Sequence, residues 1–216
     1  SFPTRRASDL EYAKRDFEYI GFREFSDIMS NLESISEQIK YCYSTVERLV
    51  KLNQRRVRIK KSYCHPHDVI EELVILKEEQ LRANNIRLNV QLATKLPAIA
   101  IGEIDFNQIM TNLFNNAIEA MPGGGALTIK TAYLKKAQQV QITIHDEGIG
   151  IAKENMPHVF DPFFTTKQRG LGRNSGLGLT IVYALVKDYH GEITLESNMR
   201  KGTVVQIVFA AKQAKV

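Results

Sequence analysis

The 216-residue chain contains no Trp, only two Cys and no run of 18 apolar residues. Without such a run, no segment of this sequence predicts a membrane-spanning helix. Cys42 and Cys64 lie in different kinds of segment, so they predict no disulfide, and we expect a reducing, cytoplasmic environment. Internal repeats and low-complexity tracts are lacking too. A hydrophobic content of 44% still suffices for one globular core with a helical appendage.

Two common nucleotide-binding motifs are also missing. The phosphate loop G-x-x-x-x-G-K-[ST] occurs nowhere, and the best approach to a dinucleotide fingerprint, at residues 170–172, follows polar residues instead of an apolar strand. A net charge of +5 is a reason to consider nucleic acid as a binding partner. The cations are spread along the chain without a nucleic-acid-binding motif, so we predict no nucleic acid partner.

The periodicity of apolar residues divides the chain into a helical arm, 11–56, a linker, 57–66, and a domain, 67–212. Apolar residues recur with three-four spacing between 25 and 49, which predicts a coiled-coil-like helix that forms a homodimer. Interleaved patterns in the domain predict an α/β fold, a two-layer sandwich with a mixed sheet and helices on one face. The expected helices are 68–83, 104–121, 153–159 (a short turn) and 178–189; the expected strands are 86–92, 126–134, 138–146, 191–197 and 203–210.

Asp146 ends a segment in which apolar and polar residues alternate. We therefore expect Asp146 on the buried face, where a carboxylate is costly unless it accepts a hydrogen bond, for example from a purine's amino group. Gly148 and Gly150 follow, and we expect them to let the backbone approach a flat base closely. Standing alone, the segment would be more typical of a strand-ending turn with a solvated Asp.

Polar residues on the expected helix 104–121 include Asn112 and Asn116, which are one turn apart. Neutral amide oxygens are suitable ligands for a Mg²⁺ ion whose charge is already balanced by bound phosphate groups. The cationic, glycine-rich segment 160–176 predicts a mobile loop in which Lys167 and backbone N–H groups meet phosphate oxygens. The alternatives are an ordinary solvated helix face and a flexible loop with solvated charges.

Together these segments resemble the ATP-binding catalytic domain of bacterial sensor histidine kinases, which are members of the Bergerat-fold ATPases. Residues 112–119 match that family's N box and 146–150 its first glycine box. Residues 160–166 match its F box and 176–179 its second glycine box. The motifs occur in the family's order, so the resemblance is very specific.

The resemblance implies ATP and Mg²⁺ as cofactors and gives roles to single residues. Asn116 would ligate Mg²⁺, Asn112 would support the phosphate and metal region, and Asp146 would hold the adenine amino group. Residues 164–178 would form the ATP lid, with Lys167 near the terminal phosphate and, like the two Asn residues, catalytic. The residues expected to bind ATP are Asn112, Asn116, Asp146, Gly148, Gly150, Lys167, Gly176, Leu177 and Gly178.

The residue at position 112 separates two groups of relatives. Hydrolytic members of the fold carry a Glu four residues before the metal-binding Asn, where this chain has Asn112. Without that general base we expect slow water attack, which favours transfer of the γ-phosphoryl group to a His and then to the Asp of a response regulator. The alternatives are a nucleotide-gated binding module or degenerate kinase that transfers no phosphate, and an anti-sigma-type Ser kinase.

The N-terminal part lacks the phosphoacceptor that the resemblance implies. Residues 1–10 resemble a translated sequencing adapter, so we expect a non-native scar. The arm resembles the second helix of a dimerisation and phosphoacceptor domain, and none of the five His residues lies in a His-acid box on a preceding helix. We therefore expect a fragment that binds ATP without autophosphorylation, with the missing His and any inner-membrane anchor upstream.

Overall fold

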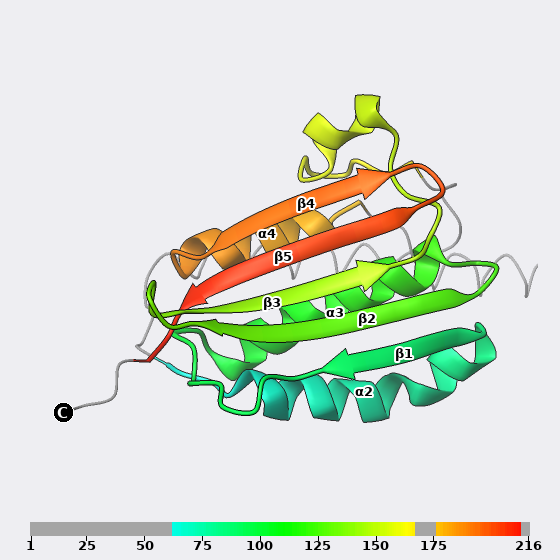
Figure 1. The fold of residues 1–216 in the computed structure, drawn as a ribbon. Helices are drawn as coiled ribbons and strands as arrows, with labels where there is room; N and C mark the ends of the chain where they lie inside the picture. The colour runs from blue at the N-terminus through cyan, green and yellow to red at the C-terminus, as the bar shows by residue number, and fades with distance from the viewer. Residues whose placement is uncertain (1–61, 167–175, 213–216) are drawn as a thin grey trace, which may run out of the picture. The chain divides into compact units, whose positions relative to one another are not determined.

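The structure is a computed structural model that describes residues 62–166 and 176–212. Its sheet contains β1 (Ile86–Gln91), β2 (Gly125–Leu134), β3 (Gln139–Asp146), β4 (Glu192–Asn198) and β5 (Gly202–Ala210). The strand order is β1-β2-β3-β5-β4 (Figure 1). β1 and β2 are parallel, and the other neighbouring pairs are antiparallel. The predicted mixed sheet is therefore confirmed.

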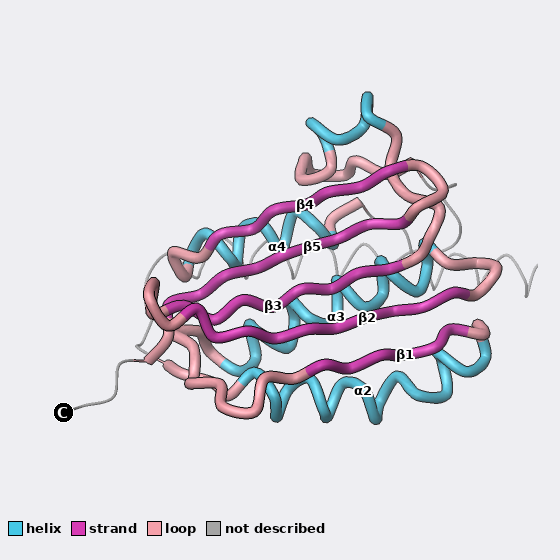
Figure 2. The backbone as a smooth tube through the Cα atoms, in the orientation of Figure 1, coloured by secondary structure: helices cyan, strands magenta, loops and turns pink. Residues whose placement is uncertain are grey.

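Helices cover one face of this sheet. They are α2 (Pro66–Ala83), α3 (Glu103–Ala120) and α4 (Gly178–Asp188), whereas the 3₁₀-helix η2 (Lys153–His158) has no buried residue and lies beyond β4 in Figure 1. In Figures 1 and 2, α3 and α4 lie behind the sheet and α2 follows its β1 edge, while no described helix crosses the near face. The predicted two-layer α/β sandwich is confirmed. None of the helices in the described ranges is long and apolar enough to span a membrane.

The core lies between the sheet and the helices. The inward residues of β3, Val140, Ile142 and Ile144, are at most 3% exposed, and they alternate with partly exposed polar residues. Phe106 of α3 meets Phe209 of β5 edge to face, with ring centroids 6.4 Å apart. Each fully buried side chain of this size contributes about 1.5–3 kcal/mol through the loss of apolar surface from water. These contacts hold α3 in place over the centre of the sheet.

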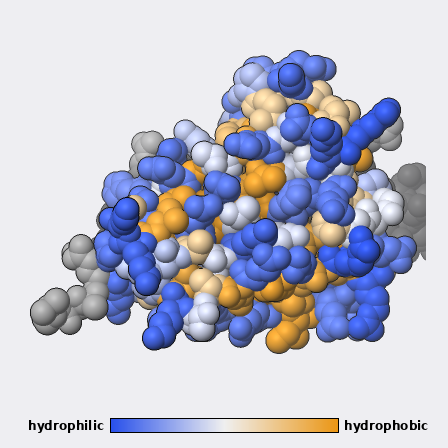
Figure 3. All heavy atoms as spheres, in the orientation of Figure 1, coloured by the Kyte–Doolittle hydropathy of each residue, from blue (hydrophilic) through white to orange (hydrophobic). Residues whose placement is uncertain are grey.

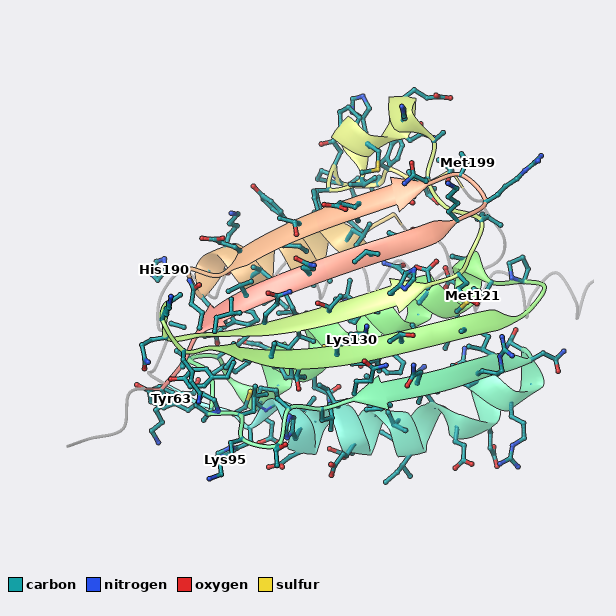
Figure 4. The ribbon with its side chains drawn as sticks, viewed as in Figure 1. Tyr63, Lys95, Met121, Lys130, His190 and Met199 are labelled. Atoms are coloured by element: carbon teal, nitrogen blue, oxygen red, sulfur yellow. The ribbon has the colours of Figure 1, made fainter. Side chains whose placement is uncertain are left out.

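The opposite face of the sheet is largely polar. On β3 it carries Gln141, Thr143 and His145, which alternate with the buried residues, and β2 adds the exposed Lys130. Figure 4 labels Lys130 on β2, and the space-filling view of the same face is mostly hydrophilic (Figure 3). An antiparallel sheet with one solvated face is expected to show this alternation.

The observed elements agree with the predicted ones to within one residue, except at the start of α2. This helix begins at Pro66, two residues earlier than predicted, and His65 caps it without a side-chain hydrogen bond. A Pro suits the first helical position because its missing N–H would have no partner there. The whole arm and residues 57–61 of the linker lie outside the described residues.

Cys64 forms part of the core, although the sequence placed it in the linker. Its backbone pairs with Ile99, and Ile99 in turn pairs with Ala211, so the two ends of the described chain meet at one place. Burial is the main cause that raises the pKa of the Cys64 thiol to about 12. The thiol is therefore protonated at neutral pH and takes no part in nucleophilic chemistry.

Two isoleucines test the burial of the helical layer. Ile109 of α3 is fully buried, whereas Ile75 of α2 is 73% exposed. We expect Ile109→Ala to lower the free energy of unfolding by about 2–5 kcal/mol, because it removes apolar contacts and leaves a cavity. Ile75→Ala should change it by less than about 0.5 kcal/mol. Urea denaturation followed by circular dichroism measures both, and equal losses would contradict this packing.

Candidate functional site

Asp146 ends β3 on the face of the sheet that the helices cover, and it is only 6% exposed. Its Oδ1 accepts hydrogen bonds from the N–H groups of Gly148, at 2.9 Å, and Thr203, at 3.3 Å. Burial raises the pKa of Asp146, and these donors together with His145 oppose that shift. Both bonds end on Oδ1, so Oδ2 is the oxygen that a ligand's donor can meet.

The segment 146–150 is wedged between two other parts of the chain. A Cβ on Gly148 would lie 2.6 Å from the carbonyl oxygen of Ala120, the last residue of α3. Gly150 has φ +71°, and a Cβ there would run into the carbonyl oxygen of Asn198 at the end of β4. The protein's own backbone thus requires both glycines. Their contact with a base stays a prediction.

Asn112 and Asn116 lie one turn apart on α3. The Nδ2 of Asn112 is buried and has no hydrogen-bond partner among the described residues. A buried donor without an acceptor costs about 1–3 kcal/mol, so this amide fits a ligand that brings an oxygen atom. A phosphate oxygen would meet that need.

Asn116, on α3, lies next to the N-terminus of the neighbouring helix α4. A Cβ on Gly178, the first residue of that helix, would be 3.6 Å from the Oδ1 of Asn116. The first N–H groups of a helix have no partner within it, and the helix dipole adds positive charge there, so anions are favoured. The neighbouring Leu177 is 2% exposed and belongs to the core, so any contact it makes with a nucleotide would come from its backbone.

The F box, residues 160–166, is attached to the beginning of α4. Gly176 has φ +66°, and a Cβ on it would lie 2.5 Å from the carbonyl carbon of Phe163. Phe160 stacks on Tyr183 of α4 with ring centroids 5.0 Å apart. Phe163 is 54% exposed, so it is not a core residue. The F box and the beginning of the second glycine box therefore lie close together.

The structure brings the predicted residues into two groups at one end of the sheet. Asp146 and the first glycine box form one group, and Asn116 with Gly178 forms the other. Ile149 donates a hydrogen bond to the carbonyl oxygen of Ala120 at 2.9 Å, so α3 connects both groups. Met199, whose Cα would lie 3.0 Å from a Cβ on Gly150, and Met121, which follows Ala120, are labelled at the same end of the sheet in Figure 4. Lys167 lies outside the described residues.

Sequence reasoning missed two polar residues beside Asp146. Thr203 of β5 is paired with Asp146 across the sheet and is 8% exposed. Ser197 of β4 is paired with Thr203, and their hydroxyl oxygens are 2.9 Å apart. An inward Thr at the start of β5 is a weak signal, because only the strand order shows that it lies next to the carboxylate.

A buried acceptor, an amide pair and a helix N-terminus at one end of an α/β sandwich are the parts of a nucleotide-binding domain. Residues 102–213 match the family described as "Histidine kinase-, DNA gyrase B-, and HSP90-like ATPase". The chain belongs to this family. It therefore carries the ATP-binding domain that the sequence motifs predicted.

The similar proteins are histidine kinases. Sporulation kinase E of Bacillus subtilis (strain 168) is 32% identical over 149 residues, which are 69% of this chain and 20% of that kinase. The catalytic domain of histidine kinase ThkA is 26% identical with a TM-score of 0.61, over 71% of this chain and 97% of that domain. Full-length ShkA, solved in complex with AMPPNP, is 20% identical with a TM-score of 0.67, over 79% of this chain and 36% of ShkA, and shows a common fold.

We predict that Asp146→Asn abolishes the binding of adenine nucleotides without destabilising the free protein. Asn keeps Oδ1 as an acceptor for the N–H groups of Gly148 and Thr203. In place of Oδ2, however, it carries an amino group, so two hydrogen-bond donors would face each other when adenine's amino group approaches. Because burial raises the pKa of Asp146, its ionised form costs stability at neutral pH. The free variant should unfold at or above the wild-type temperature, and calorimetry should show no saturable binding.

The pH dependence of the wild type follows from the same shift in the pKa of Asp146. The raised pKa of Asp146 adds stability to the free protein at low pH, and this contribution is lost as the pH rises through the raised pKa. Nucleotide affinity should instead fall as the pH falls through the raised pKa of Asp146, which lies above the ordinary Asp value of 3.8. Asp188→Asn, at the exposed end of α4, is the matched control. Wild-type affinity that stays constant down to the ordinary range of Asp would contradict this role.

Proposed function

We propose that this chain is the catalytic core of a sensor histidine kinase that binds ATP with Mg²⁺ and transfers the γ-phosphoryl group to a His. The His would lie on a dimeric helical domain, to which the arm 11–56 would belong, and a response regulator Asp would receive the phosphoryl group from it. The buried Nδ2 of Asn112, which has no hydrogen-bond partner among the described residues and is one helical turn from Asn116, is the observation that carries this proposal. A hydrogen-bond acceptor such as a phosphate oxygen would satisfy it, at the place where the motifs predict the phosphates.

The residues present fit ATP at both of its ends. Asp146 Oδ2 would accept a hydrogen bond from the adenine amino group, and the N-terminus of α4 would receive the phosphates. Mg²⁺ would be held by Asn116 Oδ1 together with phosphate oxygens and water, and it would neutralise charge on the phosphoryl group. Lys167 would add a second positive charge from the lid.

Phosphoryl transfer is favoured over hydrolysis because the site lacks the water-activating carboxylate at position 112. The amide of Asn112 cannot take a proton from water at neutral pH. What Asn112 can do is donate its N–H to a phosphate oxygen, which positions the nucleotide without activating a nucleophile. The acceptor must then be a group with its own nucleophilic atom, such as a neutral imidazole nitrogen.

Calorimetric titration with a non-hydrolysable ATP analogue, with and without Mg²⁺, tests the site. We expect saturable binding that Mg²⁺ tightens, and we expect Asn116→Ala to remove at least about tenfold of this Mg²⁺ effect, because it deletes the metal's protein ligand. Asn115→Ala is the matched control on the same helix, since Asn115 accepts a hydrogen bond from Lys77 instead. Absence of binding in the wild-type chain would refute the proposal.

The phosphoacceptor is tested with a longer chain that includes the upstream residues of the gene. Incubation with γ-labelled ATP should give an acid-labile, base-stable label, which is characteristic of phosphohistidine, and the present chain should give none. Transfer to a receiver domain would then deplete the label. A longer chain that binds ATP with no such label would instead support the nucleotide-gated module.

A further inference from the structure

The helices α3 and α4 lie side by side and run in opposite directions. At one end Asn116 of α3 is next to Gly178, the first residue of α4. At the other end Asp105, in the first turn of α3, contacts Tyr189, the residue that caps the C-terminus of α4. Eleven residues separate the two contacts on each helix, which corresponds to about 16 Å. The two helices are therefore in contact at both ends, and one of these ends is the proposed phosphate site.

A hydrogen bond forms the contact at the far end. The hydroxyl of Tyr189 donates to Oδ2 of Asp105 at 2.5 Å. A hydroxyl that donates to a carboxylate at this distance makes a charge-assisted hydrogen bond, which is about twice as strong as a neutral one. Asp105 is 9% exposed, so water competes little for this contact. The bond is directional, whereas the apolar contacts of Val182 and Leu185 with the core are not.

The surroundings of this bond are closely packed. A Cβ on Gly102, which precedes α3, would lie 3.4 Å from the hydroxyl of Tyr189 and 3.8 Å from Oδ2 of Asp105. The same Cβ would lie 3.1 Å from the Oγ of Ser62, the first described residue. The bond therefore lies where the described part of the chain begins.

The C-terminal end of α4 is also packed against the sheet. Gly191 follows this end, and a Cβ on it would lie 2.8 Å from the ring of Phe209 on β5. Phe209 in turn meets Phe106, the neighbour of Asp105 on α3, edge to face. Both α3 and the sheet therefore determine the position of this end of α4.

The two ends of α4 lie far apart along the sheet. His190, just beyond the C-terminus of α4, is labelled at one end in Figure 4, and Met121, just beyond the Asn116 end of α3, is labelled at the other. Because eleven residues of helix span about 16 Å, a tilt of about 5° at Tyr189 would move the N-terminus of α4 by about 1.4 Å. A displacement of this size misplaces the first N–H groups of α4 relative to Asn116 and a bound phosphate.

We propose that Asp105 and Tyr189 are positioning residues whose hydrogen bond determines the direction of α4 and so places its N-terminus at the phosphate site, an inference that rests on the proposed function. The two residues act through α4, because this helix carries the N–H groups that would meet the phosphates. Asp146 accepts its hydrogen bonds from Gly148 and Thr203, which are not on α4. Loss of the bond between Asp105 and Tyr189 should therefore weaken phosphate binding and leave the base-binding part unchanged.

The first test separates the phosphate part of the site from the base part. The full chain is titrated with a non-hydrolysable ATP analogue by calorimetry and with adenosine, which has no phosphate, by NMR chemical shifts. We expect Tyr189→Phe, which retains the ring and deletes the hydroxyl, to weaken binding of the ATP analogue about tenfold and of adenosine by less than about twofold. The control is Tyr133→Phe, which removes a hydroxyl bonded to Gln138 and should leave both affinities unchanged.

Variants of Asp105 test the same bond from its other side. Asp105→Ala should weaken binding of the ATP analogue as Tyr189→Phe does, and in the double variant the two effects should not add, because each deletes the same hydrogen bond. Asp105→Asn keeps a side-chain oxygen that can accept from Tyr189, so it should retain most of the affinity. Additive losses would mean that the two residues act separately, which contradicts the proposal.

Residual dipolar couplings measure the direction of α4 relative to the sheet in the free protein. We expect α4 to be tilted by a few degrees in Tyr189→Phe, while the direction of α3 stays the same. An unchanged direction of α4 would overturn the inference and leave the proposed function intact.

The outcomes of the titrations distinguish this inference from the proposed function. If the wild-type chain binds no ATP analogue, the proposed function fails, and this inference fails with it. If the ATP analogue binds equally well to the wild type and to Tyr189→Phe, the inference is overturned and the proposed function stands. Equal weakening of the ATP analogue and of adenosine would likewise overturn it, since the hydroxyl of Tyr189 would then only support the fold.

Discussion

The burial of one carboxylate determines how this end of the domain is built. Asp146 follows Ile142 and Ile144 in the same inward alternation, so the pattern that forms the core also carries a charged group into it. Burial raises the pKa of Asp146, and two backbone N–H donors offset only part of that effect. A ligand with a donor would supply what the protein does not, which is consistent with the proposal that this strand end binds the base.

The spacing between the two parts of the site is determined by α3. Asn116 lies four residues before the end of this helix, and Ala120 at its end accepts the hydrogen bond from Ile149. Four residues of helix correspond to about 6 Å along its axis. Phe106 and other inward residues of α3 are fully buried, so the helix cannot slide without disturbing a densely packed core. The proposed base and phosphate parts of the site are therefore held at a constant separation by α3.

Sequence periodicity was sufficient for the elements and for the inward direction of Asp146, because both depend on local alternation. It was not sufficient for Ser197 and Thr203, which become neighbours of Asp146 only through the order β3-β5-β4. The glycine positions were predictable, but not their nearest neighbours, since Ala120 and Asn198 come from distant parts of the chain. The predicted start of α2 was wrong by two residues, because the helix begins at a Pro that lies before its periodic apolar residues. The roles of Lys167 and of the arm remain predictions.

The site also has a cost in the free protein that a bound nucleotide would remove. The ionised Asp146 lies in an apolar layer, and the Asn112 amide has a buried donor without a partner among the described residues. A buried donor without an acceptor costs about 1–3 kcal/mol, and burial disfavours the ionised form of the Asp146 carboxylate. Both are on packed elements, β3 and α3, so neither can turn to water at low cost. A ligand that provides an amino donor at one end and phosphate oxygens at the other satisfies both groups at once. Part of the binding free energy then appears as stabilisation of the fold, which makes the same polar groups the source of recognition and of ligand-dependent stability.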